Sequence, residues 1–168
     1  MLRRDSVEVA ERRHPLRVYE QRIVPDTEGA GRYRGAPSAR VEYGPIGTSI
    51  VVAYGSDGAV NPALGARGGL EGAPTKHMKR TADGNLVDLP PLAIVTLQDG
   101  ERIVSMTCGG GGYGPPIERD AAQVQRDVIE GWITVGRARE VYGVALTEDR
   151  ELDTAETARL REQVRNGH

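Results

Sequence analysis

The chain of 168 residues can form one domain with a small appendage, and two large domains are excluded. Its 22 Lys and Arg residues and 24 Asp and Glu residues give a formal net charge of −2, which argues against general nucleic-acid binding. The longest uncharged apolar run, 50–54, is far shorter than the roughly 20 residues of a membrane span, and no secretory signal is evident, so a cytoplasmic protein is expected.

Strands are expected up to Thr107, because apolar residues there alternate with polar ones or form short runs. Val7 and Val9, for example, flank Glu8, which predicts a short strand before a longer one. The expected strands lie at 7–9, 16–24, 39–43, 48–54, 92–97 and 102–107. Turn-favouring residues predict tight hairpins at 44–47 and 98–101, and an antiparallel meander is the simplest arrangement.

Residues 55–88 are rich in glycine and carry few paired apolar residues. A structureless loop of this length is uncommon in a compact domain. Ordering it costs roughly 1 to 2 kcal/mol of backbone entropy per residue, so we expect it to lie against a surface, most naturally that of a partner chain. The basic cluster 75–80, which contains His77, is expected to be a solvated loop or to meet a phosphate or an acidic partner.

Helical spacing follows the last expected strand. Asp120, with Gln123 at the capping-box position, predicts a helix that ends at Gly131. The two further expected helices run from Thr134 to Gly143 and from Asp153 or Thr154 to the end of the chain.

The expected fold class is therefore α+β. A β-rich body of short, mostly antiparallel strands with long Gly-rich loops is followed by two or three short carboxy-terminal helices. We expect a β-rich domain with a helical end over 1–147 and an amphipathic helical tail over 148–168.

A glycine-rich loop stands between the last expected strand and the first expected helix. Its residues are Gly109, Gly110, Gly111, Gly112, Tyr113 and Gly114. Glycines between a strand and a helix let backbone N–H groups approach an anion, so this loop is a candidate cofactor-binding or anion-binding site. The alternative is close packing of backbone against backbone or at a subunit edge, because Pro115 and Pro116 lack N–H donors and no phosphate-loop Lys follows.

Four side chains are candidates for contact with a partner: Arg32, Tyr33, Arg34 and Trp132. Arg, Tyr and Trp are enriched at interface hot spots. The structural alternatives are that Tyr33 covers a sheet edge and that Trp132 packs between two helices.

No catalytic residue and no metal-ligand set is assigned. The single cysteine, Cys108, cannot form an internal disulfide or a multi-thiolate zinc site, and nothing near it in sequence would lower its pKa. The histidines, His14, His77 and His168, are too scattered to argue a metal site. Helix capping accounts for Asp120 beside Glu118.

Several joined motifs carry a family resemblance. They are Arg119-Asp120, the helix 121–130, Gly131, Val135, Ala138, Arg139 and 142–144, with Pro15-Leu16, Pro25-Asp26, 29–35, Gly68-Gly69 and 72–74 upstream. In this order they resemble the carboxy-terminal portion of the hydantoinase B family, which includes parts of 5-oxoprolinase and of the ketone carboxylases. The resemblance covers most of the chain. Cys108, in place of a small or nonthiol residue, and Pro115, in place of an acidic one, depart from the pattern, so any role of that acid is absent here.

The resemblance implies a small subunit of a hetero-oligomeric, ATP-dependent amidohydrolase or ketone carboxylase. Members of the family are much longer, so a split gene or a truncated form is implied. Larger hydantoinase B type and hydantoinase A type partners would carry out the catalysis and would bind ATP and a divalent metal. This chain is expected to bind no cofactor and, in isolation, to be inactive. The alternative is a freestanding binding module that holds a small anion at the loop 109–114.

Overall fold

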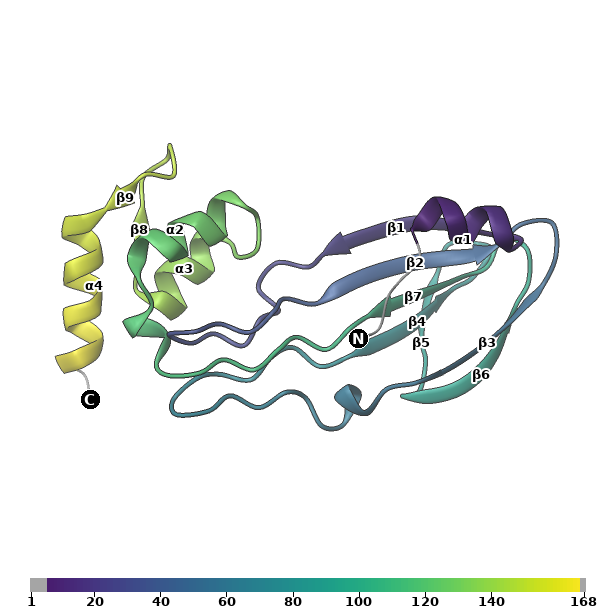
Figure 1. The fold of residues 1–168 in the computed structure, drawn as a ribbon, viewed down its shortest axis with the longest axis horizontal. Coiled ribbons are helices and arrows are strands. Elements are labelled where there is room, and N and C mark those ends of the chain that lie inside the picture. Colours follow the sequence, from purple (N-terminus) through teal and green to yellow (C-terminus); the bar gives the residue numbers. More distant parts are fainter. Residues whose placement is uncertain (1–5, 167–168) are drawn as a thin grey trace. The chain divides into compact units, whose positions relative to one another are not determined.

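The computed structural model describes residues 6–166, and these form two compact units. The first, called the sheet unit, contains the described residues up to Arg22 together with 39–61 and 75–107. The second, called the helical unit, contains 23–38, 62–74 and the described residues from Cys108 onward. Figure 1 shows mainly strands in the first and mainly helices in the second, which confirms the α+β class.

The sheet unit consists mainly of two antiparallel sheets. The larger has the strand order β1 (Leu16–Ile23), β2 (Ala39–Pro45), β7 (Arg102–Met106), β4 (Lys76–Arg80) and β5 (Leu86–Asp88). The smaller pairs β3 (Ile50–Gly55) with β6 (Leu92–Leu97). A helix, α1 (Val7–Arg13), precedes β1, and a 3-10 turn, η1 (Asp57–Ala59), follows β3.

The expected strand at 7–9 is wrong, because this segment forms α1. The Ser6 hydroxyl accepts a hydrogen bond from the Val9 N–H at 3.4 Å and so caps the first turn. Glu8 lies in that turn and Arg12 and Arg13 lie in the last, where their charges suit the helix dipole. These end signals outweigh a two-valine alternation.

Both expected hairpins are also wrong, although the strands beside them are confirmed. β2 pairs with β7 and β3 pairs with β6, so the segment β2–β3 runs antiparallel to the segment β6–β7. The turn at 98–101 does form, with the Glu101 N–H donating to the Gln98 carbonyl at 2.9 Å, but it joins strands of different sheets. The bend at 44–47 passes close to the turn at 98–101. A Cβ on Gly44 would lie 2.3 Å from the Glu101 carbonyl oxygen, so only glycine allows the two backbones to approach this closely.

The segment 55–88, expected as a long loop, contains η1, β4 and β5. β4 lies inside the larger sheet, between β7 and β5. Its sequence, Lys-His-Met-Lys-Arg, does not alternate apolar and polar residues, so the sequence alone does not predict a strand here. Pairing with β7, which includes His77 opposite Ser105, places it in the sheet.

The helical unit confirms the expected helices. They are α2 (Ala121–Ile129), α3 (Val135–Tyr142) and α4 (Thr154–Asn166), with a 3-10 turn, η2 (Pro116–Glu118), and a short pair, β8 (Ala145–Leu146) and β9 (Leu152–Asp153). Asp120 accepts from the Gln123 N–H at 3.0 Å, and Thr134 accepts from the Arg137 N–H at 3.1 Å. Gly143 ends α3 with φ +60°, the left-handed cap that favours glycine.

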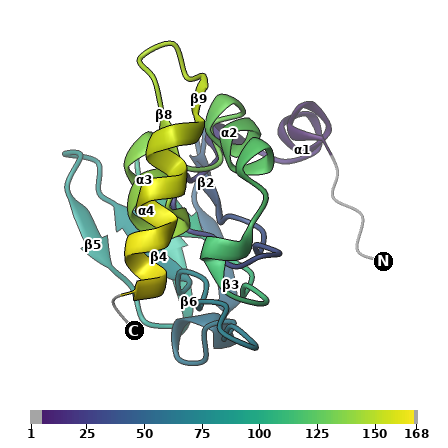
Figure 2. The ribbon, with the colours of Figure 1, turned by 90° about the vertical axis from the view of Figure 1, so that its left-hand side faces the viewer.

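A small apolar core joins α2 and α3. Its buried residues are Ala30, Val124, Val128, Ile133, Ala138, Tyr142 and Val144. α4 lies beside α3 (Figure 2) and buries only Thr157, whose hydroxyl accepts from the Ala145 N–H at 3.0 Å. The domain boundary at 147 stays a prediction, and 167–168 lie outside the described residues. None of the helices in 6–166 is long and apolar enough to span a bilayer.

Candidate functional site

Three extended segments of the helical unit lie side by side, and we call them the glycine assembly: 27–36, 63–73 and 108–114 (Figure 1). The Gly109 N–H donates to the Ala73 carbonyl at 2.8 Å, and the Gly110 N–H donates to the Ala36 carbonyl at the same distance. A Cβ on Gly35 would lie only 1.9 Å from the Gly110 carbonyl oxygen. The segments therefore approach each other backbone to backbone.

The glycine-rich loop has most of its N–H groups engaged within this assembly. Besides Gly109 and Gly110, Gly112 donates to Leu70, Tyr113 to Tyr33 and Gly114 to Ala66, at 2.8–2.9 Å. An anion site needs N–H groups that are free to turn toward the ligand. Anion binding at the loop stays a prediction, and this geometry favours the alternative of close backbone packing.

A buried carboxylate fastens the segment 27–36 to α2. Asp127 accepts from Arg34 at 3.0 Å through one oxygen and from Arg119 at 3.0–3.1 Å through the other. The Arg34 side chain is only 11% exposed, and its guanidinium lies 4.2 Å from the centroid of the exposed Trp132 ring. Both Arg34 and Trp132 therefore have structural roles inside the helical unit.

A second buried carboxylate fastens the same segment to α3. Glu28 accepts from the Arg137 guanidinium at 2.7 Å and from the Tyr142 hydroxyl at 2.9 Å. Burial and the neighbouring Glu28 raise the pKa of Tyr142 well above its ordinary value, so this phenol stays protonated and serves as a donor. Both donors bind Oε1 of Glu28, whereas Oε2 is buried without a hydrogen-bond partner in the described structure.

Three of the four predicted contact residues, Arg32, Tyr33 and Trp132, remain exposed, and Arg34 does not. Tyr33 is 62% exposed, and its ring lies 6.3 Å from that of the exposed Tyr113. Arg32 lies 3.8 Å from Glu118, and the two line an open hollow of about 490 Å³ with Tyr33. The interface assignment stays a prediction, and the exposed aromatic pair of Tyr33 and Tyr113 supports the part of it that concerns Tyr33.

The sheet unit contains a cavity that the sequence did not indicate. Its volume is about 240 Å³, and it is lined by residues of β2, β3, β4 and β7. His77 Nδ1 lies 2.9 Å from the Ser105 hydroxyl, the His77 ring lies 4.4 Å from that of Tyr54, and His77 Nε2 is buried without a hydrogen-bond partner in the described structure. Burial lowers the pKa of His77.

An arginine cluster lies on the larger sheet around the buried Glu42. Arg80 donates to Glu42 at 2.8 Å and Arg102 donates at 3.3 Å. These hydrogen bonds, from Arg80 above all, lower the pKa of Glu42. A carboxylate held ionised by two guanidinium groups carries no proton to donate, so the arrangement is structural.

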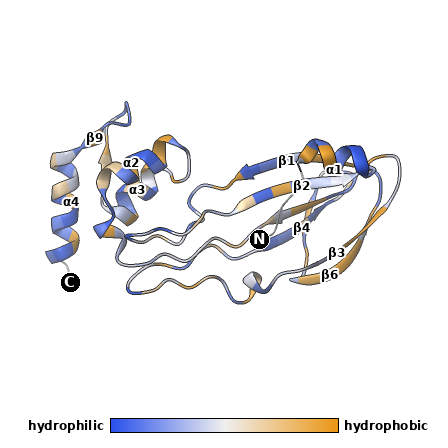
Figure 3. Cartoon of the chain, in the orientation of Figure 1, coloured by the Kyte–Doolittle hydropathy of each residue, from blue (hydrophilic) through white to orange (hydrophobic). Residues whose placement is uncertain are grey.

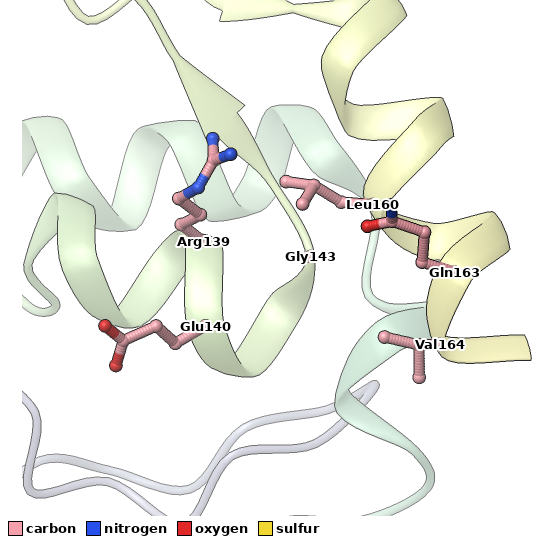
Figure 4. A pocket seen from close by; sticks show the side chains of 6 residues that line it. All are labelled: Arg139, Glu140, Gly143, Leu160, Gln163 and Val164. Atoms are coloured by element: carbon pink, nitrogen blue, oxygen red, sulfur yellow. The ribbon is translucent and has the colours of Figure 1, made fainter. Parts of the chain in front are cut away.

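The remaining candidates, Cys108, a metal site and the groove between α3 and α4, show no arrangement typical of catalysis. The Cys108 thiol is half-buried and donates to the Gly109 carbonyl at 3.2 Å. Within residues 6–166, no group of three or more His, Cys, Asp or Glu side chains is arranged to hold a metal ion. An open groove of about 460 Å³ lies between α3 and α4. The residues that line it, shown in Figure 4, include no Ser, Cys or Thr nucleophile: Arg139, Glu140, Gly143, Leu160, Gln163 and Val164.

Comparison with known proteins identifies relatives that share this sequence and fold. The chain is 32% identical over 156 residues to "Caprolactamase subunit beta" of Pseudomonas jessenii, covering 90% of this chain and 27% of the relative. It is 34% identical over 86 residues to "Acetophenone carboxylase delta subunit" of Aromatoleum aromaticum, covering 49% of this chain and 13% of the relative. The crystal structure of ATP-dependent caprolactamase from Pseudomonas jessenii matches with a TM-score of 0.77 and 26% identity, over 94% of this chain and 28% of that one.

The chain thus spans about a quarter of the length of the caprolactamase subunit that it resembles. The family model for hydantoinase B/oxoprolinase matches residues 1–116. Sequence, fold and family model agree, and the chain belongs to the hydantoinase B/oxoprolinase family.

Proposed function

We propose that this chain is a small subunit of a hetero-oligomeric, ATP-dependent enzyme that hydrolyses cyclic amides or carboxylates ketones. In this assembly it completes a hydantoinase B type subunit and supports its active site. The observation that carries the proposal is the family match of a chain that spans only about a quarter of its caprolactamase relative. We also propose a cytoplasmic location for this assembly.

The proposed reaction begins when ATP phosphorylates the oxygen of a cyclic amide or of an enolised ketone, with ADP leaving. For an amide, the net reaction consumes water and ATP and yields the ring-opened amino acid, ADP and phosphate. The alternative, carboxylation of a ketone, is supported by the acetophenone carboxylase relative. We assign ATP to a hydantoinase A type subunit and a divalent metal to the larger polypeptides.

The residues of this chain fit a supporting role. Its buried carboxylates, Glu28, Glu42 and Asp127, are held by arginines, and its glycine assembly is locked by backbone hydrogen bonds. Groups fixed in this way keep neighbouring segments in place and do not move protons. A rigid scaffold of this kind suits the support of a site whose reacting groups lie on another polypeptide.

Reconstitution tests the proposal. Larger hydantoinase B type and hydantoinase A type polypeptides are mixed with or without this chain, and ATP hydrolysis is measured with lactams, with hydantoins, and with ketones plus bicarbonate. We expect substrate-dependent ATP hydrolysis only when this chain is present. Equal turnover without the chain, or turnover by the chain alone, would contradict the proposed role.

A further inference from the structure

The outer face of the β3–β6 sheet is apolar and exposed. Val51, Leu92 and Ile94 are 68%, 77% and 76% exposed. The register places Thr96 opposite Val51, Ala53 opposite Ile94 and Gly55 opposite Leu92, so this face is one strip without a charged residue, and Thr96 is its polar side chain. Figure 3 shows both strands in hydrophobic colours.

The opposite face of the same two strands is already packed. Val52 and Tyr54 line the cavity over the larger sheet, and Leu97 is fully buried. A strand that meets water on one side normally alternates apolar and polar residues, whereas a continuous apolar run is typical of a strand covered on both sides. β3 and β6 therefore have the composition of a middle layer, and one cover is absent from residues 6–166.

The area of the strip limits what kind of contact can cover it. Six-residue strands are about 20 Å long and two of them are about 10 Å wide, so the strip offers about 200 Å². A stable interface between two copies needs about 800 Å² from each. The strip is therefore too small to be a whole interface, and it fits the centre of a larger contact.

We propose that the outer face of β3–β6 docks against the rest of the hydantoinase B fold, the part that lies outside these 168 residues. This inference rests on the proposed function. The caprolactamase relative is several times longer than the region that this chain matches, so a large body is available as the occupant. The strip, free of charged side chains, calls for an apolar partner surface, because burying unpaired charges against it would be costly.

The test is a binding measurement with the remaining hydantoinase B type segment supplied as a separate polypeptide. Ile94→Lys places a charge at the middle of the strip, and Val60→Lys, at a position 70% exposed and outside both sheets, is the matched control. Both positions face solvent in this chain, so melting temperatures should stay close to wild type. We expect Ile94→Lys to weaken binding about tenfold or more, and Val60→Lys to leave it nearly unchanged.

Hydrogen exchange provides a readout that does not depend on a variant. Amides of 50–55 and 92–97 should gain protection on binding. If wild type binds but Ile94→Lys binds equally well, the docking surface is wrong while the proposed function stands. If wild type does not bind the segment at all, the proposed function fails. A dimer of the chain alone that Ile94→Lys splits would show that a second copy is the occupant and overturn the inference.

Discussion

Different interactions stabilise the interior of each of the two units. The sheet unit relies on strand ladders and on side chains packed between two sheets, and it leaves apolar side chains of β3 and β6 exposed. The helical unit relies on backbones that touch directly in the glycine assembly and on carboxylates locked by arginines. The comparison teaches that the sheet unit should tolerate changes on its open face, whereas the helical unit should not tolerate added atoms in its assembly.

The largest effect is expected from Gly35→Ala. Its Cβ would lie 1.9 Å from a backbone oxygen of Gly110, which cannot rotate away. We expect a loss of about 4 kcal/mol or more in the free energy of unfolding, enough to unfold the helical unit. Denaturant titration followed by circular dichroism measures it.

Gly136→Ala is the matched control for Gly35→Ala. The position lies in α3, and the nearest atom to its Cβ would be 3.7 Å away. Alanine there should stabilise the unit by about 0.5–1 kcal/mol, because glycine is a poor helix former. If both substitutions had the same sign, the close backbone approach would not govern the unit.

Asp127→Ala should produce the next largest effect. It leaves Arg34 and Arg119, both largely buried, without their carboxylate. Breaking such a pair costs about 3–5 kcal/mol. Thermal and urea denaturation measure the loss.

The control for Asp127→Ala is the exposed cluster of Glu156 with Arg139 and Arg159. Hydrogen bonds from Arg159 and Arg139 lower the pKa of Glu156 to about 2, yet solvent screens these charges. Glu156→Ala should therefore change stability far less than Asp127→Ala. Comparable losses would show that burial does not decide the contribution of these ion pairs.

A smaller, pH-dependent effect is expected from His77 in the sheet unit. Burial lowers its pKa in the folded state, so the unfolded chain binds the proton more readily. The stability contributed by neutral His77 is present above its ordinary pKa of about 6.5 and falls as the pH drops through the lowered value. Melting temperatures should decline on acidification, and His77→Phe should decline less than wild type. The exposed His14→Gln serves as the control and should follow wild type.

The smallest effect on folding is expected from Tyr33→Ala, which should lower recovery of the complex without changing the melting temperature. Ile129→Ala, another exposed apolar position in the helical unit, is the control. Trp132→Ala should also lower recovery, but through instability, because it removes the ring under Arg34. Equal recovery with Tyr33→Ala would remove Tyr33 from the interface.

Local signals in the sequence were sufficient for the carboxy-terminal helices. Asp120, Thr134 and Gly143 act on their own turns, so their roles can be read without the fold. Strand pairing is not local. The bends at 44–47 and 98–101 look like hairpin turns, and only the partners across the sheet show that the chain changes sheets there.

The site residues show the same limit. Arg34 and Tyr33 are neighbours in sequence and looked equally available to a partner. Asp127, 93 positions away, buries Arg34 and leaves Tyr33 exposed. His77 looked like part of a solvated basic segment until its pairing opposite Ser105 placed it beside a cavity. Distant contacts decided each of these outcomes.

The central claim is that this chain works as part of a hydantoinase B type body. The most direct test is native mass spectrometry of the chain produced together with hydantoinase B type and hydantoinase A type polypeptides. The account predicts one assembly whose mass includes all three, with this chain equal in copy number to the hydantoinase B type polypeptide. A chain that remains monomeric while the other two assemble and turn over substrate would contradict it.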